Sequence, residues 1–328
     1  RGAGNRWLCR LQAGKCEGSV PVVPRARVES KALSALASLL VAFDSAAFHP
    51  PSNFWPAFRS KLPSLRAVSH SLMASNTGDM GRLKGQNVIV TGGGRGIGRA
   101  IALLCAEEGA QVAILARSQA ELESVVEEGR ERGLPPMLMR TADITDEAAV
   151  DDAISDLVKD MGNIDLLVNN AGGASAKAPL HEQSVAEFRK LLDLNVVSIV
   201  IVSSAVLRHA MLRQGKGHII NISSRAGKMG LPKNGPYVAS KFAVEGLTAT
   251  MAAELKEEAG ADGSVGGIRV NSISPGMVNT ISFPKAPGRA GVRTAESIRD
   301  GLLFLHLESG GCTGRYLHVD EFDAAVDA

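Results

Sequence analysis

The stretch N-V-I-V-T-G-G-G-R-G-I-G, residues 87–98, decides the fold of this chain. It opens with a short apolar run rich in β-branched residues, which is typical of a buried parallel strand. The glycines follow at once, and the apolar pattern from Ile97 to Leu104 then indicates a helix. A strand, a glycine turn and a helix in this order are the context in which a dinucleotide binds.

Three glycines of this loop have distinct predicted tasks. Gly92 permits the tight turn, and Gly96 lets the backbone approach a pyrophosphate at the positive end of the helix. Gly98 lets the helix pack closely on the strand. The spacing is G-x-x-x-G-x-G rather than the commoner G-x-G-x-x-G.

The next expected strand, Gln111 to Ala116, bears on the choice of cofactor. An NAD site usually places an acid near this strand end for the ribose 2′-hydroxyl, and this chain has Ala116 there, followed by Arg117. Arg95 lies in the glycine loop, and two guanidinium groups suit a 2′-phosphate. These residues predict NADP(H) over NAD(H); the alternative is two solvated surface arginines.

A tyrosine and a lysine stand four residues apart in Y-V-A-S-K, Tyr237 to Lys241, with Ser224 thirteen residues upstream of the tyrosine. Positions i and i+4 share a helix face, so an ammonium would lie beside a phenol. A nearby cation lowers the pKa of a phenol toward neutrality. The spacing predicts proton transfer coupled to hydride transfer, whereas a lone tyrosine is usually a packing residue.

From about Leu83 to Thr280 the chain resembles the short-chain dehydrogenase/reductase family. The matching motifs are T-G-G-G-R-G-I-G (91–98), Asp143 in A-D-I-T-D, N-N-A-G (169–172), Asn195 in L-D-L-N-V, Ser224, Y-V-A-S-K (237–241), and Pro275-Gly276 followed by Thr280. Several motifs in the right order are far more specific than any one of them.

The resemblance implies a mechanism. Tyr237 is the acid/base, and Lys241 lowers its pKa and holds the nicotinamide ribose. Ser224 stabilises charge on the substrate oxygen, and Asn195 supports a water chain to the lysine; we expect Ser223 to point to the other face of its strand. The expected cofactor contacts are Thr91, Gly92, Arg95, Gly96, Ile97, Gly98, Arg117, Asp143, Asn169, Ala171, Gly172, Tyr237, Lys241, Pro275, Gly276 and Thr280.

The pattern after residue 80 alternates strands and helices. Further strands are expected at 165–168, 218–222 and 268–273, and helices near 97–108, 118–132, 146–160, 184–213, 237–258 and 295–308. This predicts a doubly wound parallel α/β sheet, a Rossmann fold, in a single domain spanning 81–328.

Residues 1–80 differ in composition from the rest of the chain. They hold ten Lys/Arg and four Asp/Glu, against 26 and 30 in the remainder, and they are rich in Ser, Ala and Pro. Such a leader resembles an organelle transit peptide, or it is upstream sequence with the start at Met73 or Met80. We expect it to be poorly ordered, with the protein cytoplasmic or, if it is a transit peptide, in a plastid or mitochondrion.

Four scattered cysteines and seven histidines show no metal-ligand or disulfide pattern. The small positive net charge comes from the leader, so nucleic acid is not an expected partner. The apolar run 32–43 is too short to span a membrane. The expected partner is a small carbonyl or alcohol substrate.

Two segments depart from the family. The loop Ile281 to Arg293 is shorter than the lid many members carry, and it leaves the site open or forms a short cap. In the tail, T-G-R-Y-L-H-V-D (313–320) resembles the last strand, but Glu321-Phe322 replaces the usual glycine pair. That tail often builds the tetramer interface, so a homo-oligomer is expected but the usual assembly is in doubt.

The sequence therefore predicts an NADP(H)-dependent carbonyl reductase or alcohol dehydrogenase. A narrower version is a 3-oxoacyl-acyl-carrier-protein reductase. The alternative from another class is a non-catalytic NADP-binding sensor or scaffold. The intact set of Asn195, Ser224, Tyr237 and Lys241 favours an enzyme.

Overall fold

The computed structural model describes residues 81–259, 266–280, 289–309 and 311–326. The expectations for the leader, residues 1–80, and for most of the loop after Thr280 lie outside these residues.

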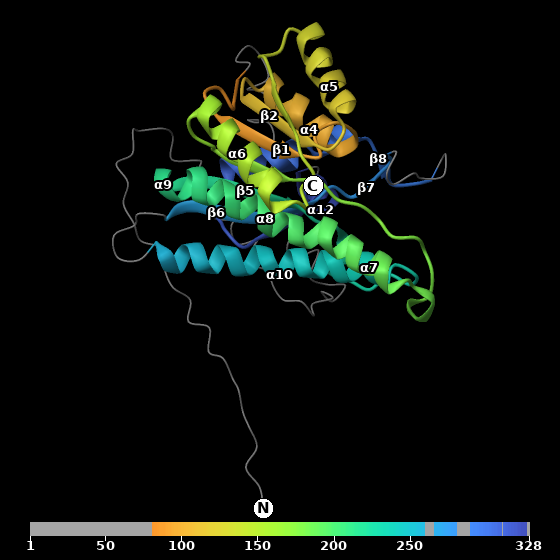
Figure 1. Ribbon diagram of the computed structural model, residues 1–328. Coiled ribbons are helices and arrows are strands. Elements are labelled where there is room, and N and C mark those ends of the chain that lie inside the picture. The colour runs from red at the N-terminus through yellow and green to blue at the C-terminus, as the bar shows by residue number, and fades with distance from the viewer. Residues whose placement is uncertain (1–80, 260–265, 281–288, 310, 327–328) are drawn as a thin grey trace, which may run out of the picture.

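A parallel sheet of seven strands forms the centre of the domain (Figure 1). Its order is β3-β2-β1-β4-β5-β6-β9, so the chain reverses its direction of travel across the sheet between β1 and β4. In open α/β sheets such a switch point opens the crevice where ligands bind. The strands are β1 (Asn87–Thr91), β2 (Gln111–Ala116), β3 (Leu138–Thr141), β4 (Leu166–Asn169), β5 (Lys216–Ile222), β6 (Gly267–Ser274) and β9 (Tyr316–His318).

Helices cover both faces of the sheet. One apolar cluster joins the sheet to α4 (Gly96–Glu107), α5 (Gln119–Glu131), α11 (Arg299–Leu303) and α12 (Val319–Val326). The other joins it to α6 (Glu147–Met161), α8 (Ser198–Val206) and α10 (Gly235–Glu258). Strand residues alternate between the clusters, as Val88 and Val90 face the first and Ile89 the second. The predicted doubly wound sheet is confirmed.

The expected helices and strands are present, but three strands of the structure were not expected. The sequence-based prediction missed β3, an edge strand in which no residue is fully buried. Its four residues, L-M-R-T, have no clear apolar run, and their position is set by pairing with β2. A small separate pair, β7 (Met277–Val278) and β8 (Val292–Arg293), was also not expected.

The predicted helix 184–213 is a helical run interrupted by π-turns. It comprises α7 (Val185–Leu192), the π-turn η2 (Asp193–Val197), α8, a second π-turn η3 (Leu207–Met211) and α9 (Leu212–Gln214). By length and composition this run could cross a membrane. Its buried residues Val202, Val206 and Met211 belong to the core cluster shared with α6 and α10, so core packing accounts for part of its apolar character. Figure 1 shows α10 alongside it.

A pair of buried histidines lies between β5 and the π-turn η6 (Phe304–Glu308). The Nδ1 atoms of His218 and His306 are 3.1 Å apart, and the rings stack at 5.3 Å between centroids. His218 Nε2 lies 2.9 Å from the Asn271 amide, and His306 Nε2 lies 2.6 Å from Gln86 Oε1. Burial is the main cause that lowers the pKa of His218 well below its usual range and the pKa of His306 to about 4.

This pair should make the fold sensitive to acid. The unfolded histidine titrates near ~6.5, so between that pH and about 4 the unfolded state binds more protons than the folded state. Stability should therefore fall as pH drops through this window, by roughly 3 kcal/mol for His306 alone. Urea titrations of wild type and His306→Gln should show a stability difference that shrinks as pH falls. A stability difference between the two proteins that does not change with pH would contradict the lowered pKa of His306.

Candidate active site

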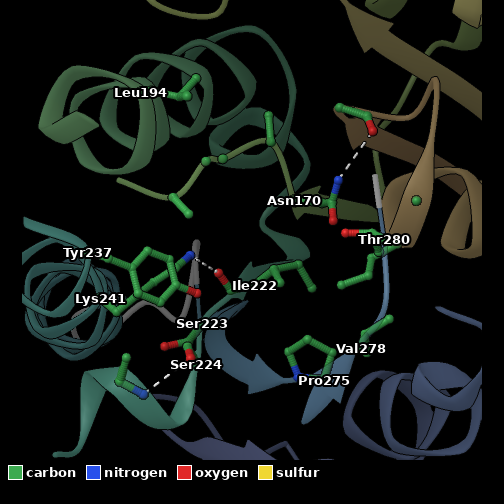
Figure 2. A pocket seen from close by; sticks show the side chains of 18 of the residues that line it. Asn170, Leu194, Ile222, Ser223, Ser224, Tyr237, Lys241, Pro275, Val278 and Thr280 are labelled. Atoms are coloured by element: carbon green, nitrogen blue, oxygen red, sulfur yellow. Dashed lines mark hydrogen bonds between the residues drawn. The ribbon is translucent and has the colours of Figure 1, made fainter. Parts of the chain in front are cut away.

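A cavity of about 890 Å³ opens at the carboxyl ends of the central strands (Figure 2). It runs from the glycine turn after β1, past the segment after β4, to the end of β5 and the first turns of α10. Most predicted site residues line it: Gly92, Arg95, Gly96, Ile97, Arg117, Ala171, Gly172, Ser224, Tyr237, Lys241, Pro275, Gly276 and Thr280. Segments far apart in sequence thus meet at one pocket.

The glycine turn offers an anion site at the start of α4. Gly92 and Gly96 adopt positive φ angles of 64° and 55°, which glycine tolerates best. Helices α5, α6 and α7 each begin with a side-chain cap, whereas α4 receives none from its N-cap residue Arg95 and has no acid in its first turn. Its first N–H groups therefore remain available at the pocket, as a pyrophosphate requires. The residues present fit a dinucleotide.

Three predicted cofactor residues do not line the pocket but support the segments that form it: Thr91, Gly98 and Asn169. Thr91 Oγ1 accepts hydrogen bonds from the backbone N–H groups of Asn170 (3.0 Å) and Ala171 (3.1 Å). Gly98 packs so closely on the glycine turn that a Cβ would overlap a carbonyl oxygen there. The Asn169 amide is buried and donates to two side chains, Ser203 and Asn221, at 2.9 Å each.

Asn170 joins the turn to the fourth strand, and it was not among the predicted site residues. Its side-chain amide donates to the Thr91 carbonyl at 2.9 Å, and the residue lines the pocket. The N-N-A-G motif holds the residue, so the motif could have identified it. The second asparagine faces the cofactor turn because β4 ends at Asn169.

Both predicted arginines, at the end of the pocket next to the glycine turn and β2, form ion pairs with acids. Arg95 pairs with Glu121 at 3.0 Å, and Arg117 lies 3.8 Å from Asp143. Asp143 does not line the cavity, although the residues on either side of it do. A backbone hydrogen bond from Thr145 is the main cause that lowers the pKa of Asp143. Glu121 was missed because helical spacing from the loop does not reveal that α5 returns over it.

Tyr237 and Ser224 are hydrogen-bonded to each other at the opposite end of the pocket. Ser224 lies two residues past β5 and accepts a hydrogen bond from the Ala226 N–H at 3.2 Å. Burial raises the pKa of the Tyr237 phenol, and the hydrogen bond with Ser224 acts in the opposite direction. The expectation that the tyrosine pKa is lowered is therefore wrong for this state, because loss of water outweighs the local contacts. The phenol is held in its protonated form.

Lys241 lies one helical turn after Tyr237 and is buried. Its ammonium donates to the Ile222 carbonyl at 2.8 Å and lies 5.8 Å from the centre of the tyrosine ring. Burial lowers the pKa of Lys241 to about 8, and Glu245 acts against that shift. The i, i+4 spacing placed the two side chains on one face as expected, and Figure 2 shows the ammonium between the ring and Ile222.

Asn195 sits in the π-turn η2 and bridges two parts of the site. Its side chain accepts from the Gly173 N–H at 2.8 Å and donates to the Gly173 carbonyl and to Ser240 Oγ at 3.0 Å each. Ser240 in turn donates to the Tyr237 carbonyl at 2.7 Å. Asn195 does not line the cavity. It fixes the segment after β4 against the helix that carries Tyr237 and Lys241.

Ser223 also lines the cavity, contrary to expectation. The alternation rule fails because β5 ends at Ile222, so Ser223 is no longer in the strand. Figure 2 shows Ser223 and Ser224 together beneath Tyr237.

The C-terminal segment that departs from the family pattern, Glu321-Phe322, lies in helix α12, and this helix reaches the pocket. Phe322 is buried against Phe304, with 5.1 Å between ring centroids. Asp320 lines the cavity and pairs with Arg225 at 3.0 Å and with Arg293 at 2.7 Å. The segment that replaces the family's glycines thus anchors a helix beside the wall of the site.

A family model described as short chain dehydrogenase matches residues 86–287. This span covers more than half of the chain. The chain belongs to the short-chain dehydrogenase/reductase family. Membership implies a nicotinamide cofactor, which the glycine turn and the uncapped helix α4 fit.

Named members of the short-chain dehydrogenase/reductase family align over most of the domain. An L-fucose dehydrogenase of Bos taurus is 38% identical over 256 residues, 73% of this chain and 89% of that protein. A gluconate 5-dehydrogenase of Gluconobacter oxydans is 36% identical, covering 62% and 75%. A solved Shigella flexneri short chain dehydrogenase complexed with NADP has a TM-score of 0.66 and 26% identity, covering 74% of this chain and all of that one. The chain is therefore a dehydrogenase-type oxidoreductase.

Proposed function

We propose that this chain is an NADP(H)-dependent oxidoreductase that interconverts a carbonyl and an alcohol, with Tyr237 as the acid/base. The observation that carries the proposal is the meeting of Tyr237, Ser224 and Lys241 in a cavity that also contains the glycine turn. A proton donor, a hydrogen-bonding hydroxyl and a cation beside a dinucleotide site suit carbonyl reduction.

In this proposal each group has its own task. A bound nicotinamide supplies or accepts the hydride. In reduction the Tyr237 phenol gives its proton to the carbonyl oxygen, and its raised pKa keeps it protonated until then. Ser224 hydrogen-bonds the same oxygen. The resulting phenolate is stabilised by Ser224 and by the Lys241 ammonium 5.8 Å from the ring centre.

Asn195 acts indirectly in this proposal. Its three hydrogen bonds hold Gly173 and Ser240 in place. Because Ser240 is bonded to the Tyr237 backbone, the asparagine orients the tyrosine against the segment after β4.

The preference for NADP(H) rests on the two guanidinium groups near Ala116. Arg95 and Arg117 line the cavity, and their ion pairs with Glu121 and Asp143 are exposed. Exposed pairs contribute only ~0–1 kcal/mol, so a 2′-phosphate can recruit both guanidiniums at small cost. An acid beside the 2′ position would instead favour NAD(H). Glu121 lines the cavity next to Arg95, so the two cofactors must be compared directly.

We expect kcat/KM for NADPH to exceed that for NADH by at least ~10-fold, about 1.4 kcal/mol. Arg117→Asp should reverse the preference, because it repels the phosphate and offers an acceptor to a 2′-hydroxyl. Steady-state kinetics with both cofactors on one substrate checks this. Arg130→Asp, at an exposed position of α5 outside the cavity, is the matched control. Equal kcat/KM values for the wild type would contradict the proposal.

A panel of ketones, aldehydes, sugars and a 3-oxoacyl thioester, followed by NADPH absorbance, tests the activity itself. Consumption that requires Tyr237 supports the oxidoreductase. Tight NADPH binding with no consumption across the panel would favour a sensor or scaffold. A response confined to the thioester would support the narrower acyl reductase.

A further inference from the structure

Two hydroxyl groups in the wall of the cavity have no partner among the residues that the structure describes. The Oγ atoms of Ser175 and Ser223 are buried and make no hydrogen bond within that part of the chain. Both residues line the cavity. A buried hydroxyl that makes no hydrogen bond destabilises the state in which it is left unpaired. A bound molecule that carries a matching polar group would remove this cost.

The hydroxyl of Ser224, unlike those of Ser175 and Ser223, has hydrogen-bond partners within the protein. Its hydroxyl accepts from the Ala226 N–H at 3.2 Å and bonds with the Tyr237 phenol. It is thus already part of the set that meets the reacting oxygen. Ser223 and Ser175 are left for a different group on the substrate.

The two unpaired hydroxyls lie on segments that follow neighbouring strands. Ser223 directly follows β5, and Ser175 lies on the segment that leaves β4. The two strands pair in parallel, with Asn169 opposite Asn221, so the segments that carry the two serines leave the same edge of the sheet. The segment before Ser175 is fixed, because Asn195 binds both backbone groups of Gly173.

The chemistry of these groups narrows the ligand. Serine hydroxyls are neutral and can both donate and accept, so they match another hydroxyl better than a purely apolar group. Ser223 is the chain neighbour of Ser224, and Figure 2 shows their side chains together beneath the tyrosine ring. Because Ser223 is next to Ser224, a polar group close to the reacting oxygen, such as a hydroxyl on the adjacent carbon, is the partner that suits it.

We propose that Ser175 and Ser223 form a second polar subsite and that the substrate is a hydroxyl-bearing carbonyl compound. In reduction this is an α-hydroxyketone or α-hydroxyaldehyde; in oxidation it is a vicinal diol. The inference rests on the proposed function and names the substrate class of the same site. Ser175 and Ser223 bind the second hydroxyl while Ser224 and Tyr237 engage the reacting oxygen.

The test compares two ketones that differ by one hydroxyl, cyclohexanone and 2-hydroxycyclohexanone, with NADPH. The wild type should show a kcat/KM ratio of at least ~10 in favour of the hydroxyketone, because a site built to bond a hydroxyl rejects the analogue that lacks it. Ser175→Ala and Ser223→Ala should each lower that ratio by at least ~10-fold. Ser175→Thr, which keeps a hydroxyl, should preserve most of it.

Ser204→Ala, in α8 and outside the cavity, is the matched control and should leave the ratio unchanged. A wild-type ratio near 1, or alanine variants that keep the wild-type ratio, would overturn the inference. So would a loss confined to the KM for NADPH, since the hydroxyls would then bind cofactor. Turnover that survives Tyr237→Phe would instead refute the proposed function, whatever the ratio.

Discussion

Replacement of Tyr237 by Phe is expected to lower kcat by at least the ~100-fold typical of a lost general acid. The change removes the hydroxyl and keeps the ring, which lies partly buried beside Lys241. NADPH should still bind, because the glycine turn and α4 are untouched. Stopped-flow single turnovers and NADPH fluorescence titrations separate the two effects.

The comparison variant for Tyr237→Phe is Lys241→Met. It should weaken both NADPH binding and turnover, because the lysine is proposed to hold the ribose as well as to stabilise the phenolate. Near-native turnover by a folded Tyr237→Phe protein would show that the proton comes from elsewhere. Equal losses of NADPH affinity in both variants would show that the tyrosine acts in binding.

Gly98→Ala should damage the cofactor site from within the fold. A Cβ at this position would overlap the Gly92 carbonyl oxygen and the Asn170 side-chain nitrogen. The oxygen belongs to the glycine turn, which would hold the pyrophosphate, and the Asn170 nitrogen donates to carbonyls of that turn. Relief of the overlap therefore requires the turn to move. Overpacking of this kind costs about 1–3 kcal/mol or more, and we expect at least ~10-fold weaker NADPH binding together with a lower Tm.

Gly246→Ala provides the control for the added methyl group. This glycine lies in α10, where a Cβ would meet open space, and it has no positive φ angle. Alanine favours a helix interior over glycine by about 1 kcal/mol, so the control should be neutral or stabilising. NADPH affinity equal to wild type in Gly98→Ala would contradict the close packing of α4 on the glycine turn.

The sequence was sufficient for the sheet and for the grouping of Ser224, Tyr237 and Lys241, because period and spacing are local properties. It was insufficient wherever a contact depends on where an element ends. Ser223 enters the cavity because β5 stops one residue earlier, whereas Asn169 is the last residue of β4 and still faces the core. The pKa of Tyr237 was misjudged because burial is a property of the whole fold.

Tertiary contacts also explain what motifs could not show. Glu121 reaches Arg95 across 26 positions in the sequence, and Asp320 reaches Arg225 across 95. No periodic pattern connects such residues. The β3 strand was missed for a related reason, since its pairing with β2 and not its own composition sets its conformation.

The π-turn at Asn195 restricts the insertions and deletions that this helix can accept during evolution. A π-turn holds one residue more than an α-helical turn, so residues 193–197 are equivalent to a one-residue insertion within a continuous helix. Losing one codon there would rotate everything downstream by about 100° and draw it in by about 1.5 Å. Either Asn195 would leave Gly173, or Val202 and Val206 would leave the core. The length of this helix is therefore fixed at single-residue precision.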